Sequence, residues 1–376
     1  MIMKKRTLLL SILLIAALFL GYASAAGGDA GDPLISLDYL SNTFAPAAEK
    51  AAQDKLDASG KTVYDTAETI WREAVAAAEA VAGAERTNIW AQTRLKHGDI
   101  LTGLTGTQVM ALAGGVAAQF SSGAVIDVTD GTELPSGGEL KIRHRYMAAE
   151  DTTVLFTVAS RTAVIEYCGD YHFSISNATP DYNAMASALK TLSLFRGTDT
   201  GYGEGFDLEV TSTRIQALVM LIRMLGEEDA ALACTDPAPF NDVPDNFWGR
   251  PYIAYAYRMG YTNGVENNNF APDRATNAGM YVEFVLRALG YSDTTQTDIS
   301  TAAQRALNAG VITAGEKSVL DSNEFLRADV AYLSWYALDV PVASNMQPLH
   351  QKLENAGVFT SSDYWNAKSI VTSARL

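Results

Sequence analysis

The stretch FNDVPDNFWGRPYIAYAYRMGYTNGVENNNFAPDRATNAGMYVEFVLRALGY, residues 240–291, predicts two short helices joined by a loop. Gly260, Gly264, Phe270 and Pro272 mark that loop. Glycine adopts the positive φ of a chain reversal, and proline suits the turn that leads into the second helix. Neither helix is long enough to bury a core alone. The stretch is therefore predicted to be one unit of a repeat whose apolar faces are covered by neighbouring units.

Two further segments follow the same plan, at residues 183–226 and 301–338. Each has a short helix, a turn at Gly197 or Gly315, a loop with an apolar plug and a second helix. A helix with one apolar stripe needs neighbours to cover it, which favours a stacked or bundled arrangement. The second helices are predicted to open at Thr213-Arg214, Thr276-Asn277 and Leu326-Arg327.

The middle copy resembles an S-layer homology repeat. It has the F-x-D-V start, the tryptophan, the Ile/Ala-rich helix, the glycine turn and the F-x-P loop of that family, at Phe240-Asn241-Asp242-Val243, Trp248, Ile253-Ala254, Gly260 with Gly264, and Phe270-Ala271-Pro272. The family's T-R-A-E helix start corresponds to Thr213-Arg214-Ile215-Gln216, Thr276-Asn277-Ala278-Gly279 and Leu326-Arg327-Ala328-Asp329. The resemblance covers residues 178–340, and the layout resembles secreted proteins of Gram-positive, clostridia-like bacteria.

The resemblance implies a three-pronged bundle whose grooves hold a secondary cell-wall polysaccharide linked to peptidoglycan, often bearing ketal-linked pyruvate. Such an anionic sugar needs a bidentate cation and an aromatic platform. The predicted polysaccharide-binding residues are Arg214, Arg327, Trp248, Asp242 and Gly264, the last as a backbone requirement. Two alternatives stay open, because Trp248 also suits a core plug and Arg214 a pair with an acidic neighbour.

The predicted fold class is α+β. Residues 1–25 form a basic start, an apolar run and a small-x-small site, which is typical of a secretory signal peptide. No later segment is long and apolar enough to span a bilayer, so a secreted protein of the cell wall or cell surface is expected. The predicted domains are a helical segment at 26–96, a small β-rich domain at 97–177, three repeats at about 178–233, 238–291 and 292–340, and a helical tail at 341–376 that suits a capping half-repeat.

The helical segment is expected to be a hairpin or a spacer, because Gly60 and Gly83 mark breaks in its helical pattern. The β-rich domain has turn signals at Asp130-Gly131 and at 136–138. Acidic residues beside the first turn fit no calcium loop, and a solvated turn is the preferred interpretation. Arg143-His144-Arg145 is the one basic cluster; on a strand its two arginines share a face. It suits either a contact for an acidic partner or a solvated strand face.

Charge and motifs exclude several functions. The formal net charge of −15 and the lack of a basic stripe argue against nucleic acid. The four histidines form no metal-spaced pair, and no catalytic motif is present, so no catalytic residue, cofactor or metal is expected. Cys168 and Cys234 could pair but suit separate thiols. The leading hypothesis is a non-enzymatic surface protein anchored to wall polysaccharide. A wall-acting enzyme or carbohydrate-binding accessory, and a self-assembling surface-layer subunit, are the alternatives.

Overall fold

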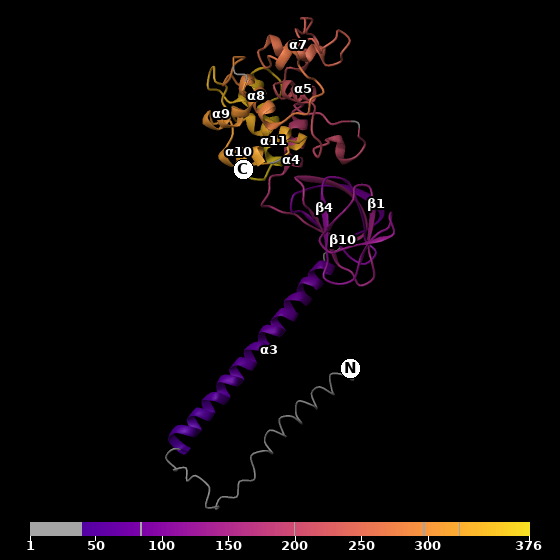
Figure 1. The fold of residues 1–376 in the computed structure, drawn as a ribbon, viewed down its shortest axis with the longest axis vertical. Coiled ribbons are helices and arrows are strands. Elements are labelled where there is room, and N and C mark those ends of the chain that lie inside the picture. The colour runs from indigo at the N-terminus through magenta and orange to yellow at the C-terminus, as the bar shows by residue number, and fades with distance from the viewer. Residues whose placement is uncertain (1–39, 83–84, 199, 296–297, 323) are drawn as a thin grey trace, which may run out of the picture. The chain divides into compact units, whose positions relative to one another are not determined.

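The computed structural model describes residues 40–376 except 83–84, 199, 296–297 and 323. The expected signal peptide at residues 1–25 lies outside the described residues. Contacts divide the chain into two units, residues 1–79 and 80–376, and each is described by itself. The second unit holds strands followed by helices (Figure 1), so the α+β class is confirmed. Among the helices that the structure describes, none has both the length and the apolar composition that crossing a bilayer requires.

A single helix replaces the expected hairpin. After the π-helical turn η1 (Leu40–Phe44), α3 runs over Ala45–Ala82 for 38 residues without a break at Gly60. One interior glycine costs about 1 kcal/mol, and the alanine-rich sequence on both sides continues the helix. Val63 and Ile70 are exposed in this unit. The prediction of a helical hairpin is therefore wrong, because a lone glycine without a following turn signal does not end a helix.

The end of the predicted helical segment is a strand. β1 (Glu85–Lys96) pairs antiparallel with β10 (Thr162–Ser174), with Ala91 opposite Tyr167 and Lys96 opposite Thr162. β1 is rich in threonine and has Ile89 and Trp90, residue types that suit a pleated surface. The helical prediction for this part was wrong because the partner strand lies some 70 positions further on.

The ten strands in the described part of the chain form one antiparallel sheet in the order β6-β5-β8-β3-β10-β2-β9-β4-β7, with β1 also on β10. The remaining strands are β2 (Ile100–Gly103), β3 (Gln108–Ala113), β4 (Val116–Gln119), β5 (Val125–Asp127), β6 (Thr132–Leu134), β7 (Gly138–Glu139), β8 (Arg145–Ala148) and β9 (Val154–Val158). The first half of β10 pairs with β3 and its second half with β2. The sheet therefore curves around a core that includes Leu101, Val109, Phe156 and Ile165 (Figure 1).

The predicted turns of this β domain are confirmed. Gly131, with φ 70°, lies between β5 and β6, and Gly137, with φ 84°, precedes β7. Arg143 and His144 belong to the turn before β8 rather than to a strand, and Arg143 has φ 63°. The prediction that all three residues of the basic cluster lie on a strand was therefore wrong.

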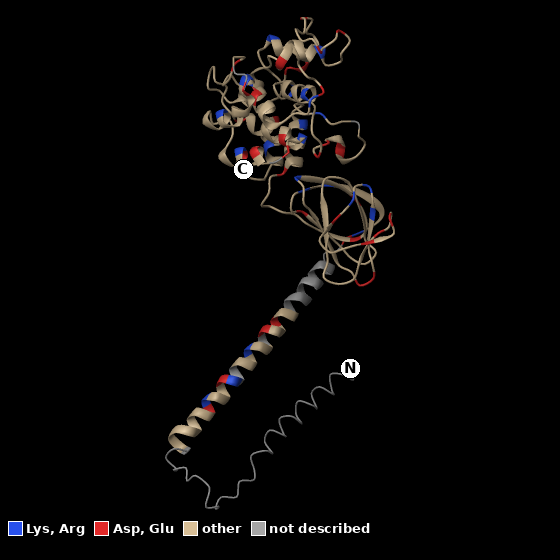
Figure 2. Cartoon of the chain, in the orientation of Figure 1, with Lys and Arg blue, Asp and Glu red and all other residues tan. Residues whose placement is uncertain are grey.

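The helices of residues 182–370 surround a second hydrophobic core. They are α4 (Tyr182–Thr191), α5 (Arg214–Met224), α6 (Glu228–Leu232), α7 (Arg250–Arg258), α8 (Ala278–Ala288), α9 (Ala302–Asn308), α10 (Ala314–Ser322), α11 (Arg327–Ala337), α12 (Leu349–Asn355) and α13 (Ser361–Ile370), with the 3-10 turns η2 (Gly203–Gly205), η3 (Glu266–Asn268) and η4 (Ile299–Thr301). Basic and acidic residues are interspersed over these helices (Figure 2).

Helices α5, α8 and α11 begin at equivalent points of the three predicted repeats. The Thr213 and Asn277 side chains accept hydrogen bonds from the backbone N–H groups three residues further on, so both are N-caps. In the middle repeat the residue equivalent to Arg214 is therefore Ala278, not Asn277. The position predicted for the T-R-A-E motif in the middle repeat is therefore one residue too early. Thr276 resembles the capping threonine in sequence, but Asn277 caps α8.

The tail folds onto the helical core through α12 and α13. Leu353 and Tyr364 are buried, and Val358 lies against Gly226 at the end of α5. Trp365, by contrast, is 60% exposed. Since residues four apart share one helix face while neighbours do not, Tyr364 and Lys368 lie together and Trp365 points elsewhere.

Candidate functional site

A cavity of about 470 Å³ lies where the start of α5 meets the turn before η3 and one side of α8. Its polar lining is unusually rich in arginine for such an acidic chain. The residues around it are Arg214, Asn263, Gly264, Val265, Glu266, Arg274, Met280, Glu283, Phe284, Arg287 and Ile299. The first and second repeats thus both contribute to one concave site.

Arg214 is the buried cation of this cavity. It is only 5% exposed, and its guanidinium carbon lies 5.0 Å from the ring centre of Phe270 and 4.9 Å from that of Phe284. Its Nη2 donates to Thr262 Oγ1 at 3.3 Å and to the Gly264 carbonyl at 3.5 Å, while its buried Nε has no acceptor among the described residues. A buried cation in contact with aromatic faces and neutral oxygens is ready to accept an anion.

Burial, together with the nearby cations Arg274 and Arg287, lowers the pKa of Arg214 to about 10 against the attraction of Asp242. The side chain stays charged at neutral pH, since about 10 is still well above 7. Among the residues that the structure describes, no carboxylate lies within ion-pair distance of it. The open alternative that Arg214 pairs with an acidic neighbour is therefore contradicted.

The acidic residues of the cavity are already neutralised or exposed. Glu283 accepts from Arg287 Nε at 2.8 Å and also forms an ion pair with Arg305. Glu266 is largely exposed and lies 3.9 Å from Arg274. The cavity thus keeps a local excess of positive charge in a chain of net charge −15. The sequence did not predict Arg274 and Arg287 as residues of this site. The four-residue spacing predicts the ion pair of Glu283 and Arg287, but it does not predict that this pair lies beside Arg214.

Gly264 and Asp242 shape the cavity rather than charge it. Gly264 has φ 80°, and a Cβ at this position would lie 2.4 Å from the Phe240 ring and 2.6 Å from the Asn269 carbonyl oxygen. The Asp242 carboxylate accepts from the backbone N–H groups of Phe270 and Ala271 at 2.8 and 2.7 Å. It therefore holds the loop that places the Phe270 ring against Arg214.

The tryptophan of the motif lies elsewhere. Trp248 is 59% exposed, contacts the rings of Phe247 and Tyr252, and is not part of the cavity lining. The alternative of a core plug is wrong because the side chain is exposed. The predicted aromatic platform is also not in this cavity: Phe270 and Phe284 supply the aromatic contacts of Arg214, and of these two only Phe284 lines the cavity.

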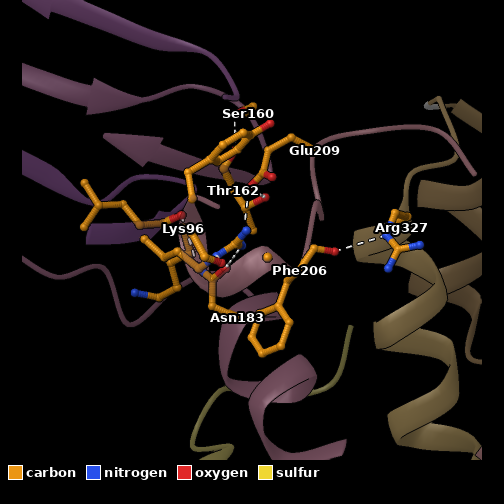
Figure 3. A network of polar contacts seen from close by, with 12 residues as sticks. Lys96, Ser160, Thr162, Asn183, Phe206, Glu209 and Arg327 are labelled. Atoms are coloured by element: carbon orange, nitrogen blue, oxygen red, sulfur yellow. Dashed lines mark hydrogen bonds and ion pairs between the residues drawn. The ribbon is translucent and has the colours of Figure 1, made fainter. Parts of the chain in front are cut away.

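Arg327 occupies the equivalent position in the third repeat but has different neighbours. It is 7% exposed, and its Nε donates to the Phe206 carbonyl at 3.1 Å (Figure 3). Its guanidinium also lies over the Phe195 ring. Asp329, two residues after Arg327, forms an ion pair with Arg161 of the β domain, with 3.1 Å between Oδ1 and Nε. Burial raises the pKa of Asp329 to about 6, although Arg161 opposes the shift. The structure therefore does not bring Arg327 to the cavity of Arg214.

The β domain meets the helices beside Arg327. Arg94 of β1 contacts Glu209 at 3.4 Å and donates to Asn183 Oδ1 at 2.9 Å and to the Gly203 carbonyl. Thr162 of β10 donates to Glu209 at 2.7 Å (Figure 3). Both charged side chains of the Arg94–Glu209 pair are at least nine-tenths buried. The region next to the third repeat's arginine is thus occupied by an interdomain joint.

A second cavity, of about 550 Å³, adjoins the start of α8. Asn277, Ala278, Asp321 and Glu324 are among its lining residues, and none of the lining residues is an arginine or a lysine. This cavity of the middle repeat therefore lacks the cation that an anionic sugar needs.

One group of side chains in the described part of the chain has the spacing of metal ligands. Ligand atoms of Asp127, Asp130 and His144 lie within 4.8 Å of one another. However, the Lys141 ammonium lies 2.5 Å from Asp130, and Asp127 accepts from two backbone N–H groups and from His144. The group is thus satisfied by protein donors, and Asp127 is only 2% exposed, so the predicted solvated turn does not describe this carboxylate.

The comparisons with known proteins match the helix–loop–helix unit that contributes to this cavity. Residues 239–277 match the S-layer homology domain, so the chain contains such a domain in its middle repeat. A "Cell surface protein" of Thermoanaerobacter kivui is 37% identical over 109 residues, 29% of this chain and 14% of the relative. A "Surface layer protein" of Brevibacillus choshinensis is 28% identical over 109 residues, 29% of this chain and 10% of the relative.

These matches confirm the predicted resemblance and indicate a secreted cell-surface protein. The chain spans less than a sixth of the length of either relative. Among solved structures, a dTDP-6-deoxy-D-glucose-3,5-epimerase from Legionella pneumophila aligns with 23% of this chain and 50% of its own, at 22% identity and a TM-score of 0.16. A recombinant pro-11S globulin of pumpkin aligns with 28% of this chain and 29% of its own, at 13% identity and a TM-score of 0.15. Scores this low carry no argument.

Proposed function

We propose that this is a non-enzymatic surface protein that attaches non-covalently to a secondary cell-wall polysaccharide. The attachment site is the cavity around Arg214, within three S-layer homology repeats that span residues 178–340. The observation that carries the proposal is a buried arginine that faces a cavity and has no carboxylate partner among the residues that the structure describes. The repeats hold the chain at the wall in this proposal, and the β domain and α3 are the parts presented at the cell surface.

The chemistry of the cavity suits an acidic substituent on a sugar. A carboxylate, such as that of a pyruvate ketal, supplies the acceptor that Arg214 lacks and forms a bidentate, charge-assisted pair with it. Arg274 and Arg287 add positive potential from the cavity wall. Because water is largely excluded around Arg214, this attraction is stronger than it would be at an open surface.

Within the three repeats, one anion site is expected rather than three. Ala278 replaces the arginine in the middle repeat, and the guanidinium of Arg327 is bound to the Phe206 carbonyl next to the interdomain joint. The predicted binding role of Arg327 is therefore replaced in this proposal by a structural one, and Arg214 alone carries the anion contact.

The experiment is co-sedimentation of the full mature chain with isolated cell-wall sacculi, before and after acid stripping of the polysaccharide. Wild-type protein is expected to bind only unstripped walls, and Arg214→Ala to lose at least tenfold in affinity because the cavity loses its central cation. Arg258→Ala is the matched control, since Arg258 is half-exposed and pairs with Asp236 outside the cavity. Equal binding by Arg214→Ala and wild type, or loss only in Arg327→Ala, contradicts the assignment.

A further inference from the structure

The β domain has a hollow of its own that the wall-binding cavity does not explain. It measures about 510 Å³ and is lined by Trp90, Met110, Val128, Thr129, Arg143, Arg145 and Glu166. Trp90 is 37% exposed and Val128 42% exposed. The hollow therefore joins accessible aromatic and apolar surface to two arginines.

The sheet register builds this surface. Gln92 lies opposite Glu166, Glu166 opposite Met110, and Met110 opposite Arg145, so these residues form one row across β1, β10, β3 and β8. Residues directly opposite each other in antiparallel pairs share a face of the sheet. The row is on the outer face, because the next residue of β8, Tyr146, is buried in the core.

Two local irregularities place the remaining side chains. The register of β1 shifts between Thr87 and Ala91, and Trp90 lies in this irregular stretch. Such bulges re-aim side chains. The Trp90 ring lies 5.3 Å from the guanidinium carbon of Arg145. Arg143 has φ 63°, a left-handed conformation that arginine rarely adopts, and this turn brings its side chain to the same hollow as Arg145.

Pairing sets these two arginines apart from the other arginines of the β domain. Arg86 pairs with Asp170 at 3.6 Å, Arg94 with Glu209 at 3.4 Å and Arg161 with Asp329 at 3.1 Å. For Arg143 and Arg145 no carboxylate lies within ion-pair distance among the described residues. Two unpaired guanidinium groups at one hollow are an anion site in a chain that is otherwise acidic.

We propose that this hollow is a second binding site, and that it takes an acidic saccharide. The two arginines suit a carboxylate on the sugar ring, Trp90 offers a stacking face for the ring, and Glu166 accepts from its hydroxyl groups. An acidic protein fits less well, because a protein partner needs about 800 Å² of matching surface rather than a hollow of this size.

This site stands independently of the Arg214 cavity. If both sites bind the same polymer, the second contact becomes intramolecular and the full chain binds more tightly than either site alone. If they bind different polymers, the β domain selects the glycan that the anchored protein contacts. Either arrangement gives the displayed β domain a role in recognising carbohydrate.

The test uses the full mature chain with Arg214→Ala, so that the first cavity does not contribute. Isothermal titration calorimetry at low salt compares tetragalacturonic acid with neutral galactotetraose. The Arg214→Ala protein is expected to bind the acidic tetramer at least tenfold more tightly than the neutral one. Adding Arg145→Ala or Trp90→Ala is expected to weaken that binding at least tenfold. Arg86→Ala is the control, because Arg86 lies on the same strand as Trp90 and pairs with Asp170. This variant is expected to change the affinity for the acidic tetramer less than twofold.

Three results overturn the proposal. The first is loss of binding with Arg214→Ala alone, which assigns the sugar to the other cavity. The second is unchanged binding after Arg145→Ala. The third is equal binding of a tetraglutamate peptide, which makes the hollow an acidic-protein contact. Arg145 and Trp90 are exposed, so their replacement is expected to leave the protein folded. Far-UV circular dichroism of each variant checks this. Wall binding by the Arg214→Ala variant is scored separately, so the two proposals fail independently.

Discussion

Arg214 combines burial, aromatic contacts and an unpaired Nε in one side chain. A buried donor without an acceptor costs about 1–3 kcal/mol, more for a charged group. Nothing in the fold requires this cost, because an apolar side chain of similar length would fill the same space between Phe270 and Phe284. The arginine is therefore expected to serve binding at the expense of stability.

Replacing Arg214 by methionine tests whether this arginine lowers the stability of the fold while it provides wall binding. We expect the free energy of unfolding to rise by about 1 kcal/mol, since a desolvated cation is replaced by an apolar chain of similar length. Wall binding is expected to be lost in the same variant. Urea denaturation and co-sedimentation measure the two effects. In Arg327→Met the free energy is expected to fall instead, because that Nε has an acceptor in the Phe206 carbonyl. A destabilised Arg214→Met protein would refute the argument.

The pKa of Arg214 predicts an alkaline limit to binding. Since it is lowered to about 10 from 12.5, wall binding is expected to persist at neutral pH and to fall as the pH rises through about 10. Stability should respond in the opposite sense. Between those two values the unfolded chain holds more protons than the folded one, so this group's contribution to the free energy of unfolding grows with pH.

Co-sedimentation between pH 7 and 11 checks this limit, with circular dichroism to show that the protein stays folded. An anion bound in the cavity raises the pKa of Arg214 and moves the midpoint upward. Binding that falls already below pH 9 in folded protein would assign the contact to another group.

At the scale of elements, the turn between α7 and α8 determines the shape of the cavity. Gly264 supplies the positive φ and the space beside Phe240, and Asp242 ties down the backbone at Phe270. The sequence motif predicts both features, because turn glycines and a loop-binding aspartate act over short stretches of chain. Their effect on Arg214 is visible only once the loop of one repeat has packed against the helix of another.

Gly264→Ala is expected to destabilise the protein by about 3 kcal/mol, from the strained φ and the clash with Phe240 together. Gly310→Ala is the matched control. Gly310 has φ 71°, but a Cβ there meets nothing within 4 Å, so only the backbone cost of about 1 kcal/mol applies. Chemical denaturation of both variants gives the difference. Equal losses would mean that the close packing around Gly264 contributes nothing.

At the scale of the whole molecule, the described part of residues 80–376 has two hydrophobic cores joined by polar contacts. Arg94 and Glu209 are the most buried ion pair across the joint, with side chains 9% and 5% exposed. Each retains one atom without a partner among the described residues. Such a pair fixes how two domains meet, while its net contribution to stability is small because desolvation offsets the attraction.

Removing one partner should therefore cost more than removing both. Arg94→Met alone is expected to destabilise by about 3–5 kcal/mol, because Glu209 stays buried without its cation. The double variant Arg94→Met with Glu209→Met is expected to recover most of that loss. Calorimetry measures both, and we expect the single variant to separate the unfolding of the two cores. A double variant as unstable as the single one would show that the pair itself carries the stability.

The amino-acid sequence by itself determined the repeat, its turn glycines and the F-x-D-V and F-x-P motifs, because these act over a few neighbouring residues. The tertiary structure alone decided that Arg214 has no carboxylate partner among the described residues, that Arg274 and Arg287 line the same cavity, that Arg327 binds the Phe206 carbonyl instead and that Trp248 is exposed. It also turned the end of a predicted helix into β1. Charge pairing and strand pairing depend on residues far apart in the chain, and local patterns carry no information about which of them meet.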